Sequence, residues 1–243
     1  MPTVLLLGAS SDMVMAIAKK FAENKYSVQL AARNSARLQA LQSDLNIRYK
    51  VDCSIHEFDA LRFSTHPSFF EGLSPRPDVT ICVFGMMEDE EKAFEDWSLT
   101  ERMIQSNYTG AVSILNVAAK YYRGRGEGTI VGISSVAGER GRKSKLIYGS
   151  AKAAFSAYLS GLRNLLCKDH VHVITIKPGF VFTKMTEQLT LPKPLTATPA
   201  EVAAVVWSAV AKQKNVVYVK WFWRYIMLII KSIPEFQFKK MNL

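Results

Sequence analysis

A tyrosine and a lysine four positions apart are the first candidates for chemistry in this chain. Tyr148 and Lys152 lie near the start of a stretch with a helical pattern, so both side chains face the same way, one turn apart. A phenol beside an ammonium group is suited to proton transfer. Such a pair is common by chance, so its meaning depends on the residues around it.

Further polar residues stand near the ends of predicted strands and helices. Ser135 follows an apolar strand, 13 residues before the tyrosine, and Asn107 lies within a long predicted helix. Pro178-Gly179 ends a later strand, and Thr183 follows it. Ligands bind at the carboxyl ends of strands in parallel sheets, so we expect these residues to meet at one site. Each of them alone is also compatible with a structural role, such as a helix cap.

The turn after the first predicted strand is a candidate pyrophosphate site, because strand, glycine turn and helix follow one another there. The candidate residues are Gly8, Ser10, Ser11, Asp12 and Met13. Asp12 and Val14 occupy positions where Rossmann glycines are expected. An ordinary strand–helix turn, capped by one of these polar side chains, is therefore an alternative.

The end of the second predicted strand indicates which dinucleotide would bind. Ala31-Ala32-Arg33-Asn34 places no carboxylate where an adenosine ribose 2′-hydroxyl would be held. Arg33 instead offers a guanidinium for a 2′-phosphate, which favours NADP(H), with NAD(H) still open. Asp59 follows the third strand and is either a partner of the adenine amino group or a solvated loop acid.

Short apolar runs alternate with helical patterns along the chain, which predicts βαβ units and a parallel sheet covered on both faces. Strands are expected over 3–7, 27–31, 50–58, 79–84, 129–133, 171–177 and 216–219. Helices are expected over 13–23, 36–45, 101–123, 147–166 and 199–212. The predicted fold class is α/β, a single Rossmann-like, doubly wound parallel sheet in three αβα layers, formed by residues 1–219.

The positive charge is concentrated near the end of the chain. There are 31 Lys and Arg against 21 Asp and Glu, a net charge of +10, and seven bases with one acid from Lys212 onward supply +6 of it. Within residues 220–243, Lys220, Arg224 and Lys231 form one stripe of a helical wheel that is otherwise largely apolar. We expect an interfacial amphipathic helix, or else a helix that closes the core or a dimer interface.

Composition excludes several classes of protein. With 49% hydrophobic and 21% charged residues, the chain is neither disordered nor a small disulfide scaffold. Three widely spaced cysteines without metal-ligand spacing predict a cytoplasmic protein and no metal site. The first apolar run is too short for a signal peptide. No recognition motif accompanies the basic segment, so we expect no nucleic-acid partner.

As a set, these motifs resemble the short-chain dehydrogenase/reductase family over residues 3 to about 219. The matching residues are Gly8-Ala-Ser-Ser, Asn107, Ser135, Tyr148 with Lys152, and Pro178-Gly-x-x-x-Thr183. Within the family, the chain is similar to the decaprenylphosphoryl-2-keto-ribose reductases of arabinan precursor synthesis. The local matches are Val83-Phe-Gly-Met-Met, Asn107-Tyr-Thr, Ala137-Gly-Glu-Arg, and Phe222-Trp-Arg-Tyr-Ile-Met with Ile233-Pro.

The resemblance implies an NAD(P)H-dependent ketone reductase and a role for each residue. Tyr148 would give its proton to the carbonyl oxygen, while Lys152 would lower the tyrosine pKa and hold the nicotinamide ribose. Ser135 would bind the substrate oxygen, Asn107 would order a proton-relaying water, and Thr183 would hold the carboxamide. Further cofactor contacts are expected at Gly85, Pro178, Gly179 and Val181.

The chain also departs from the family pattern. The Asn-Asn-Ala-Gly found after the fourth strand is replaced by Cys82-Val-Phe-Gly85, so the side-chain bonds that stabilise this strand end must come from elsewhere. Asp12 would repel a pyrophosphate unless it points away from it. Val14 should widen the contact between helix and strand unless the turn is remodelled.

The loop between the serine and the tyrosine carries four cations in six residues and must border the active site. Arg140, Arg142 and Lys143, with Lys145 beside them, are candidates for binding a substrate phosphate, although a solvated basic loop is an alternative. Together with the basic aromatic tail, this loop favours a 2-keto sugar on a polyprenyl phosphate. Another lipidic or small ketone, or a non-catalytic NADP sensor, is the alternative function.

Expectations about partners follow from the same features. We expect a homo-oligomer with peripheral contact to the inner face of a membrane. The resemblance alone implies a flavin oxidase that makes the keto sugar.

Overall fold

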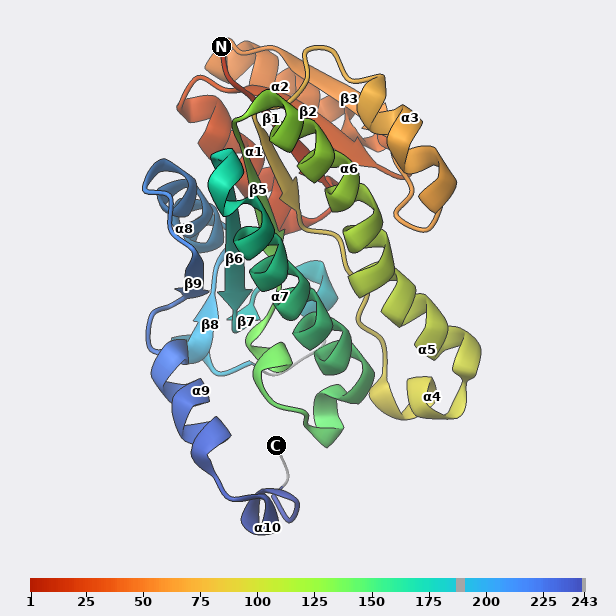
Figure 1. Ribbon diagram of the computed structural model, residues 1–243, viewed down its shortest axis with the longest axis vertical. Helices are drawn as coiled ribbons and strands as arrows, with labels where there is room; N and C mark the ends of the chain where they lie inside the picture. Colours follow the sequence, from red (N-terminus) through yellow and green to blue (C-terminus); the bar gives the residue numbers. More distant parts are fainter. Residues whose placement is uncertain (187–190, 242–243) are drawn as a thin grey trace.

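The computed structural model describes residues 1–186 and 191–241, and it confirms the predicted α/β class. A seven-stranded parallel sheet lies between two layers of helices, in the order β3-β2-β1-β4-β5-β6-β9 (Figure 1). The strands are β1 (Thr3–Leu7), β2 (Ser27–Ala32), β3 (Cys53–Glu57), β4 (Val79–Cys82), β5 (Gly128–Ile133), β6 (Val171–Pro178) and β9 (Val216–Val219). The strand order reverses between β1 and β4, and a crevice at such a point is where doubly wound sheets bind ligands.

Alternation of side chains explains why the central strand is apolar throughout. Val4 and Leu6 of β1 belong to the core on one face of the sheet, whereas Leu5 and Leu7 belong to the core on the other. All four are fully buried. A strand covered on both faces has no polar side, which is why it appears in the sequence as a continuous apolar run.

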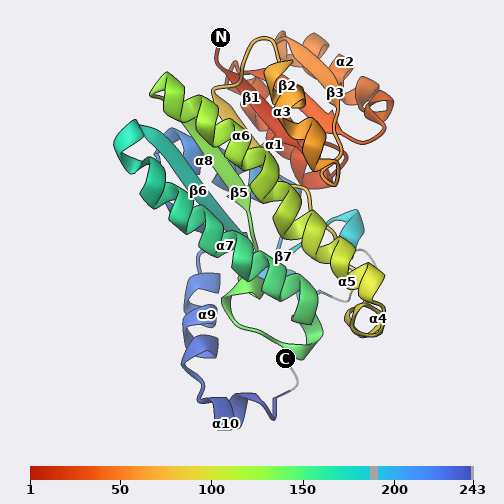
Figure 2. The same cartoon turned by 45° about the vertical axis from the view of Figure 1, so that its right-hand side comes forward.

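Helices cover both faces, as Figure 2 shows from a second angle. On one face lie α1 (Asp12–Glu23), α2 (Gln39–Tyr49) and α8 (Pro199–Ala211), and on the other lie α3 (His66–Glu71), α6 (Gly110–Arg125) and α7 (Leu146–Leu166). Each layer buries its apolar stripe against the sheet. These layers place the amino end of α7 beside the carboxyl end of β5.

The single helix predicted over 101–123 is wrong in detail. The structure has α5 (Trp97–Ile104), a π-helical turn at Gln105–Thr109, and then α6. π-Turns of this kind often mark functional sites, and Asn107 lies within this one. The two short helices α3 and α4 (Glu90–Glu95) were not expected.

Other boundaries differ by a few residues. The strand expected over 50–58 begins at Cys53, because Lys50 adopts a left-handed conformation with φ +55°. The helix expected over 36–45 starts as a 3₁₀ turn at Ser35–Leu38 and continues as α2 to Tyr49.

The last segment forms α9 (Trp223–Ser232) and α10 (Glu235–Phe238), beyond the carboxyl ends of β6 and β9 (Figures 1 and 2). Trp223 and Met227 are buried in a small apolar cluster with Val136. One face of the expected interfacial helix therefore belongs to the protein interior. Within the described ranges, no helix is both long and apolar enough to cross a membrane. The final two residues of the 220–243 extension lie outside the described residues.

Candidate active site

The structure brings Tyr148 and Lys152 together at the amino end of α7. Lys152 is 4% exposed, and its Nζ donates a hydrogen bond to the carbonyl oxygen of Ile133, at the end of β5, over 3.2 Å. The same nitrogen lies 5.8 Å from the centre of the Tyr148 ring. The helix thus places a buried cation next to the phenol, as its four-residue spacing predicts.

Ser135 completes this group from the loop after β5. It is 8% exposed, and its Oγ accepts a hydrogen bond from the backbone nitrogen of Ala137 over 3.1 Å. A side-chain hydrogen bond between Ser135 and Tyr148 acts to lower the pKa of the phenol. Serine, tyrosine and lysine therefore converge although they come from two different elements.

Burial changes the pKa values of the pair in opposite directions. Burial raises the pKa of Tyr148 to about 12, against the lowering effect of Ser135. Burial also lowers the pKa of Lys152 to about 8. The expected lowering of the tyrosine pKa by Lys152 is thus not observed, because loss of solvent is the larger effect on the phenol. Tyr148 is therefore protonated at neutral pH, whereas Lys152 changes its protonation state about one pH unit above neutrality.

Asn107 holds the segment that follows β4. Its Nδ2 donates to the carbonyl oxygens of Met86 and Met103 over 2.6 and 2.8 Å, and its Oδ1 accepts from the Met86 nitrogen over 3.3 Å. A Cβ at Gly85 would lie 2.6 Å from Asn107 Oδ1 and 3.2 Å from Lys152 Nζ. Asn107 therefore holds the backbone after β4, and a side chain at position 85 would displace Asn107 or Lys152.

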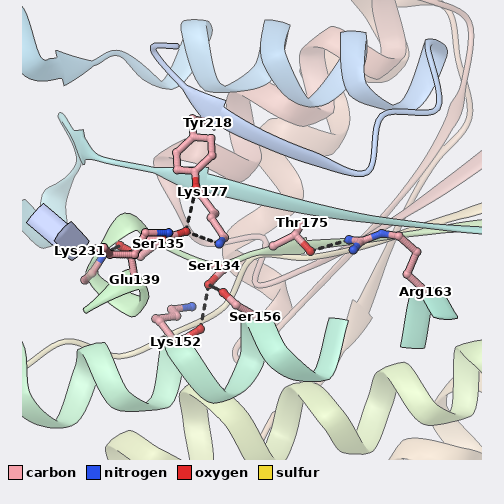
Figure 3. Close-up of polar contacts among 11 residues, drawn as sticks. Ser134, Ser135, Glu139, Lys152, Ser156, Arg163, Thr175, Lys177, Tyr218 and Lys231 are labelled. Carbon is pink, nitrogen blue, oxygen red and sulfur yellow. Dashed lines mark hydrogen bonds and ion pairs between the residues drawn. The ribbon is translucent and has the colours of Figure 1, made fainter. Parts of the chain in front are cut away.

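Ser134 is a supporting residue that the sequence analysis missed. Its Oγ donates to the carbonyl oxygen of Lys152 over 3.0 Å and shares a hydrogen bond of 2.7 Å with Ser156 (Figure 3). These bonds fasten the end of β5 to α7, the two elements that carry the catalytic candidates. The only signal in the sequence is a second serine beside Ser135.

The turn between β1 and α1 has the shape that a dinucleotide requires. Gly8 has φ +96°, and a Cβ there would lie 2.8 Å from the backbone nitrogen of Phe84. Ser11 is the N-cap of α1, and its side chain makes no capping bond. The Asp12 carboxylate accepts from the Lys184 nitrogen over 2.9 Å instead, and so bonds the loop after β7. The backbone turn therefore suits a pyrophosphate.

Val14, which was expected to widen the contact between α1 and the sheet, is accommodated in the core. It is fully buried among the apolar side chains of α1, β1 and α8. Ser10 and Met13 lie at the surface side of the same turn, exposed and half-buried respectively.

The loop after β2 is where the adenosine half of the cofactor is expected to bind. Arg33 is exposed there, and the Glu57 carboxylate accepts hydrogen bonds of 2.9 Å from the nitrogens of Asn34 and Ser35. The Glu57 carboxylate at the end of the neighbouring strand β3 is thus occupied by the backbone of this loop. Asp59 lies in the loop after β3, where its carboxylate accepts a hydrogen bond from the Leu61 nitrogen over 3.0 Å.

The loop after β6 carries the remaining cofactor candidates. Pro178 and Val181 are buried, and β7 (Phe180–Val181) pairs with β8 (Thr196–Ala197). The Thr183 nitrogen donates to the Thr186 Oγ1 over 3.1 Å. A Cβ at Gly179 would lie 2.1 Å from the indole ring of Trp223, so α9 packs directly on this loop.

The candidate phosphate residues have different surroundings. The Arg140 guanidinium donates to the carbonyl oxygens of Ile230 and Ile233, pairs with Glu235 over 2.9 Å and lies 3.6 Å from the centre of the Phe238 ring. These contacts bind the guanidinium to the C-terminal segment, so the structure favours a structural role for Arg140 over the expected contact with a substrate phosphate.

Arg142 and Lys143 are still candidates for binding a substrate phosphate. Lys143 is exposed, and Arg142 is half-buried with an Nε that has no hydrogen-bond partner among the described residues. Loss of solvent lowers the pKa of Arg142. A buried donor without an acceptor is costly, so an anionic group at this position would be stabilised.

This arrangement of a glycine turn, a reversed strand order and a Ser-Tyr-Lys group at the strand ends defines a Rossmann-type oxidoreductase. Residues 2–193 match the family of the short chain dehydrogenases, and the chain belongs to that family.

Relatives along the full length carry similar names. An uncharacterized oxidoreductase of Mycobacterium tuberculosis is 32% identical over 241 residues, covering 98% of this chain and 96% of that protein. Another, from Streptomyces coelicolor, is 30% identical and covers 98% and 95%. A short-chain dehydrogenase from Sphingobium yanoikuyae, solved in complex with NADPH, has a TM-score of 0.83 at 23% identity, with 97% of each chain covered.

Proposed function

We propose that this protein is an NADP(H)-dependent ketone reductase in which Tyr148 is the proton donor. The convergence of the buried Ser135 and Lys152 on the half-buried Tyr148 is the observation that carries the proposal. A pKa of about 12 keeps the phenol protonated, as a donor to a carbonyl oxygen must be.

Each residue has a distinct task in this reaction. The cofactor supplies the hydride when it is bound. Ser135 holds the carbonyl oxygen within reach of the phenol, and Lys152, whose pKa is about 8, exchanges protons near neutral pH and restores the phenol afterwards. Asn107 keeps the Gly85 backbone against the lysine and so fixes the position of the ammonium group.

NADPH is the preferred cofactor in this proposal. The support is the exposed Arg33, the occupied Glu57 carboxylate and the glycine turn before α1. NADPH is also what the Sphingobium yanoikuyae enzyme binds. NAD(H) remains the second candidate.

The substrate that we propose is a 2-keto pentose on a polyprenyl phosphate. In the sequence, Arg142 and Lys143 lie between Ser135 and Tyr148. The buried Arg142 Nε has no hydrogen-bond acceptor within the described part of the chain. A phosphate ester supplies several such acceptor oxygens. The resemblance of the chain to reductases of this substrate is the second support. A flavin oxidase that produces the keto sugar is then the expected partner, and a homo-oligomer the expected assembly.

A lipid substrate requires access to a membrane surface, which the outer face of the C-terminal segment could provide. Exposed side chains there are Trp221, Tyr225, Leu228, Ile229 and Phe236, with the exposed cations Arg224, Lys239 and Lys240 beside them. Aromatic and apolar residues flanked by bases suit the boundary of an anionic bilayer. Lys220 and Lys231, in contrast, pair with Glu201 and Glu139, so the expected basic stripe is largely used within the protein.

The decisive experiment measures NADPH oxidation with a keto-pentosyl polyprenyl phosphate. Tyr148→Phe should reduce turnover at least about 100-fold and leave NADPH binding intact. Tyr158→Phe is the matched control, because Tyr158 lies on the same helix and its hydroxyl bonds Asn116. Turnover of a small soluble ketone but not of the lipid would favour another substrate, and cofactor binding without any turnover would favour a sensor.

Membrane contact is tested separately with sedimented vesicles of anionic or neutral lipid. Leu228→Glu should weaken binding to anionic vesicles several-fold, whereas Ile47→Glu, at an exposed position of α2, should not. Equal binding of both variants to anionic vesicles would contradict a membrane-binding role for the C-terminal segment.

A further inference from the structure

A carboxylate from α4 bonds the first turn of the helix that carries the catalytic tyrosine. Glu90 Oε2 accepts from the Ile147 nitrogen over 2.8 Å, and Oε1 accepts from the Tyr148 nitrogen over 3.3 Å. Glu90 is half-buried, whereas Asp89, Glu91 and Lys92 around it are exposed. The two bonds join residues 57 and 58 positions apart in the chain.

The first turn of α7 needs such a partner. The first N–H groups of a helix have no acceptor within the helix, and the residue before α7, Lys145, provides no side-chain cap. Tyr148 is the third residue of this helix, within the turn that frays most easily. A carboxylate at this position satisfies two of the free donors and interacts favourably with the positive end of the helix dipole.

The segment that contains Glu90 is anchored on the active site at its other end as well. Asn107 binds both backbone groups of Met86, and Gly85 lies against Lys152. The chain from Gly85 to Glu90 therefore connects the surroundings of the lysine to the backbone of the tyrosine. Movement at either end is resisted by hydrogen bonds at the other.

We propose that Glu90 is a positioning residue for Tyr148, whose carboxylate fixes the first turn of α7 and thereby the place of the phenol relative to Ser135 and Lys152. This rests on the proposed function of Tyr148 as proton donor. The hydrogen bonds of the Glu90 carboxylate go to backbone nitrogens, so we assign it no part in the proton transfer itself.

The charge of Glu90 has a second consequence. Burial is the main cause of the raised pKa of Tyr148, the Ser135 hydrogen bond opposes it, and the negative charge of Glu90 adds to it. The other charged groups on the elements packed here are Lys152 on α7, Lys143 and Lys145 in the turn that contacts α4, and the exposed Asp89 and Glu91 on either side of Glu90 in the chain. Removing the Glu90 charge alone should therefore move the titration of the phenol to lower pH.

Three variants separate these effects. Glu90→Ala removes both acceptors, so kcat should fall about 10- to 100-fold while KM for NADPH stays unchanged. Glu90→Gln keeps one acceptor oxygen and should recover most of this kcat. Glu91→Gln, an adjacent exposed carboxylate, should change none of these quantities.

Amide hydrogen exchange at Ile147 and Tyr148 tests the contact without any substrate. Exchange at both amides should be faster in Glu90→Ala, by about tenfold or more, and close to wild type in Glu91→Gln. Unchanged exchange, or faster exchange with unchanged kcat, would overturn the role of Glu90. A wild-type protein that reduces no ketone would instead overturn the proposed function, together with the catalytic meaning of this contact.

Discussion

The Glu139 carboxylate accepts a hydrogen bond of 2.6 Å from the ammonium group of Lys231, 92 positions later in the chain. Lys177 of β6 and the Tyr218 hydroxyl of β9 bond the same carboxylate, the hydroxyl over 2.9 Å (Figure 3). Glu139 ends the 3₁₀ turn that begins directly after Ser135, and its side chain is only 5% exposed. This cluster fastens the C-terminal helix to the loop that carries the catalytic serine.

The Glu139 cluster predicts a specific acid sensitivity. Burial acts to raise the pKa of Glu139, but the bonds from Lys177 and Lys231 outweigh it and hold the pKa at about 2, against 4.5 in the unfolded chain. Its stabilisation is therefore complete above the unfolded value and is lost as pH falls toward 2. Glu139→Gln should cost roughly 1–3 kcal/mol at pH 7 and flatten the dependence between pH 5 and 2, measured by urea unfolding. Glu23→Gln, in an exposed pair, should do neither.

The buried Lys152 is expected to destabilise the protein at neutral pH although turnover requires it, in contrast to Glu139, which stabilises the fold. Lys152 has a folded pKa of about 8 against 10.5, so the unfolded chain binds more protons between these values, and stability rises with pH across that interval. Lys152→Met should abolish turnover but stabilise the protein by roughly 1–3 kcal/mol at pH 7, because no charge is then buried. A loss of stability in this variant would mean that the bond to the Ile133 carbonyl outweighs burial.

Cofactor preference is expected to depend on one guanidinium. Arg33→Ala should raise KM for NADPH at least about tenfold and KM for NADH much less, since only NADPH carries a 2′-phosphate. Arg37→Ala, in the 3₁₀ turn that follows, is the control for a general loss of positive charge. Equal effects of Arg33→Ala on both cofactors would remove the assignment.

The contact between Gly179 and Trp223 predicts coupling between the cofactor loop and α9. Gly179→Ala would drive a methyl group into the indole ring, so it should cost about 1–3 kcal/mol and weaken NADPH binding. Combination with Trp223→Leu should cost less than the sum of the two single changes, because the smaller side chain makes room. Gly161→Ala, on α7 with open space around it, should be neutral or stabilising. Strict additivity of the pair would contradict this contact.

The local pattern of apolar residues was sufficient to predict the strands of the sheet and most of the helices. Buried strands such as β1 and β6 contain runs of apolar residues, Val4–Leu7 in β1 and Val173-Ile174 with Ile176 in β6, and this pattern depends only on their own residues. The π-turn at Gln105–Thr109 was not predicted, because the bonds that Asn107 makes there reach a segment 21 residues away and leave no local pattern. Helices as short as α3 and α4 carry too few periods to be recognised.

The sequence by itself determined the Ser135, Tyr148 and Lys152 group, since a helix places residues four apart on one face and a parallel sheet gathers strand ends at one edge. Only the tertiary structure decided which charges remain available. Arg140 and Lys231 look like free cations in the sequence but are bound within the protein, and Glu90 and Glu139 have no local pattern that distinguishes them. Hydrogen bonds between distant residues depend on how the chain is packed, and no local spacing encodes them.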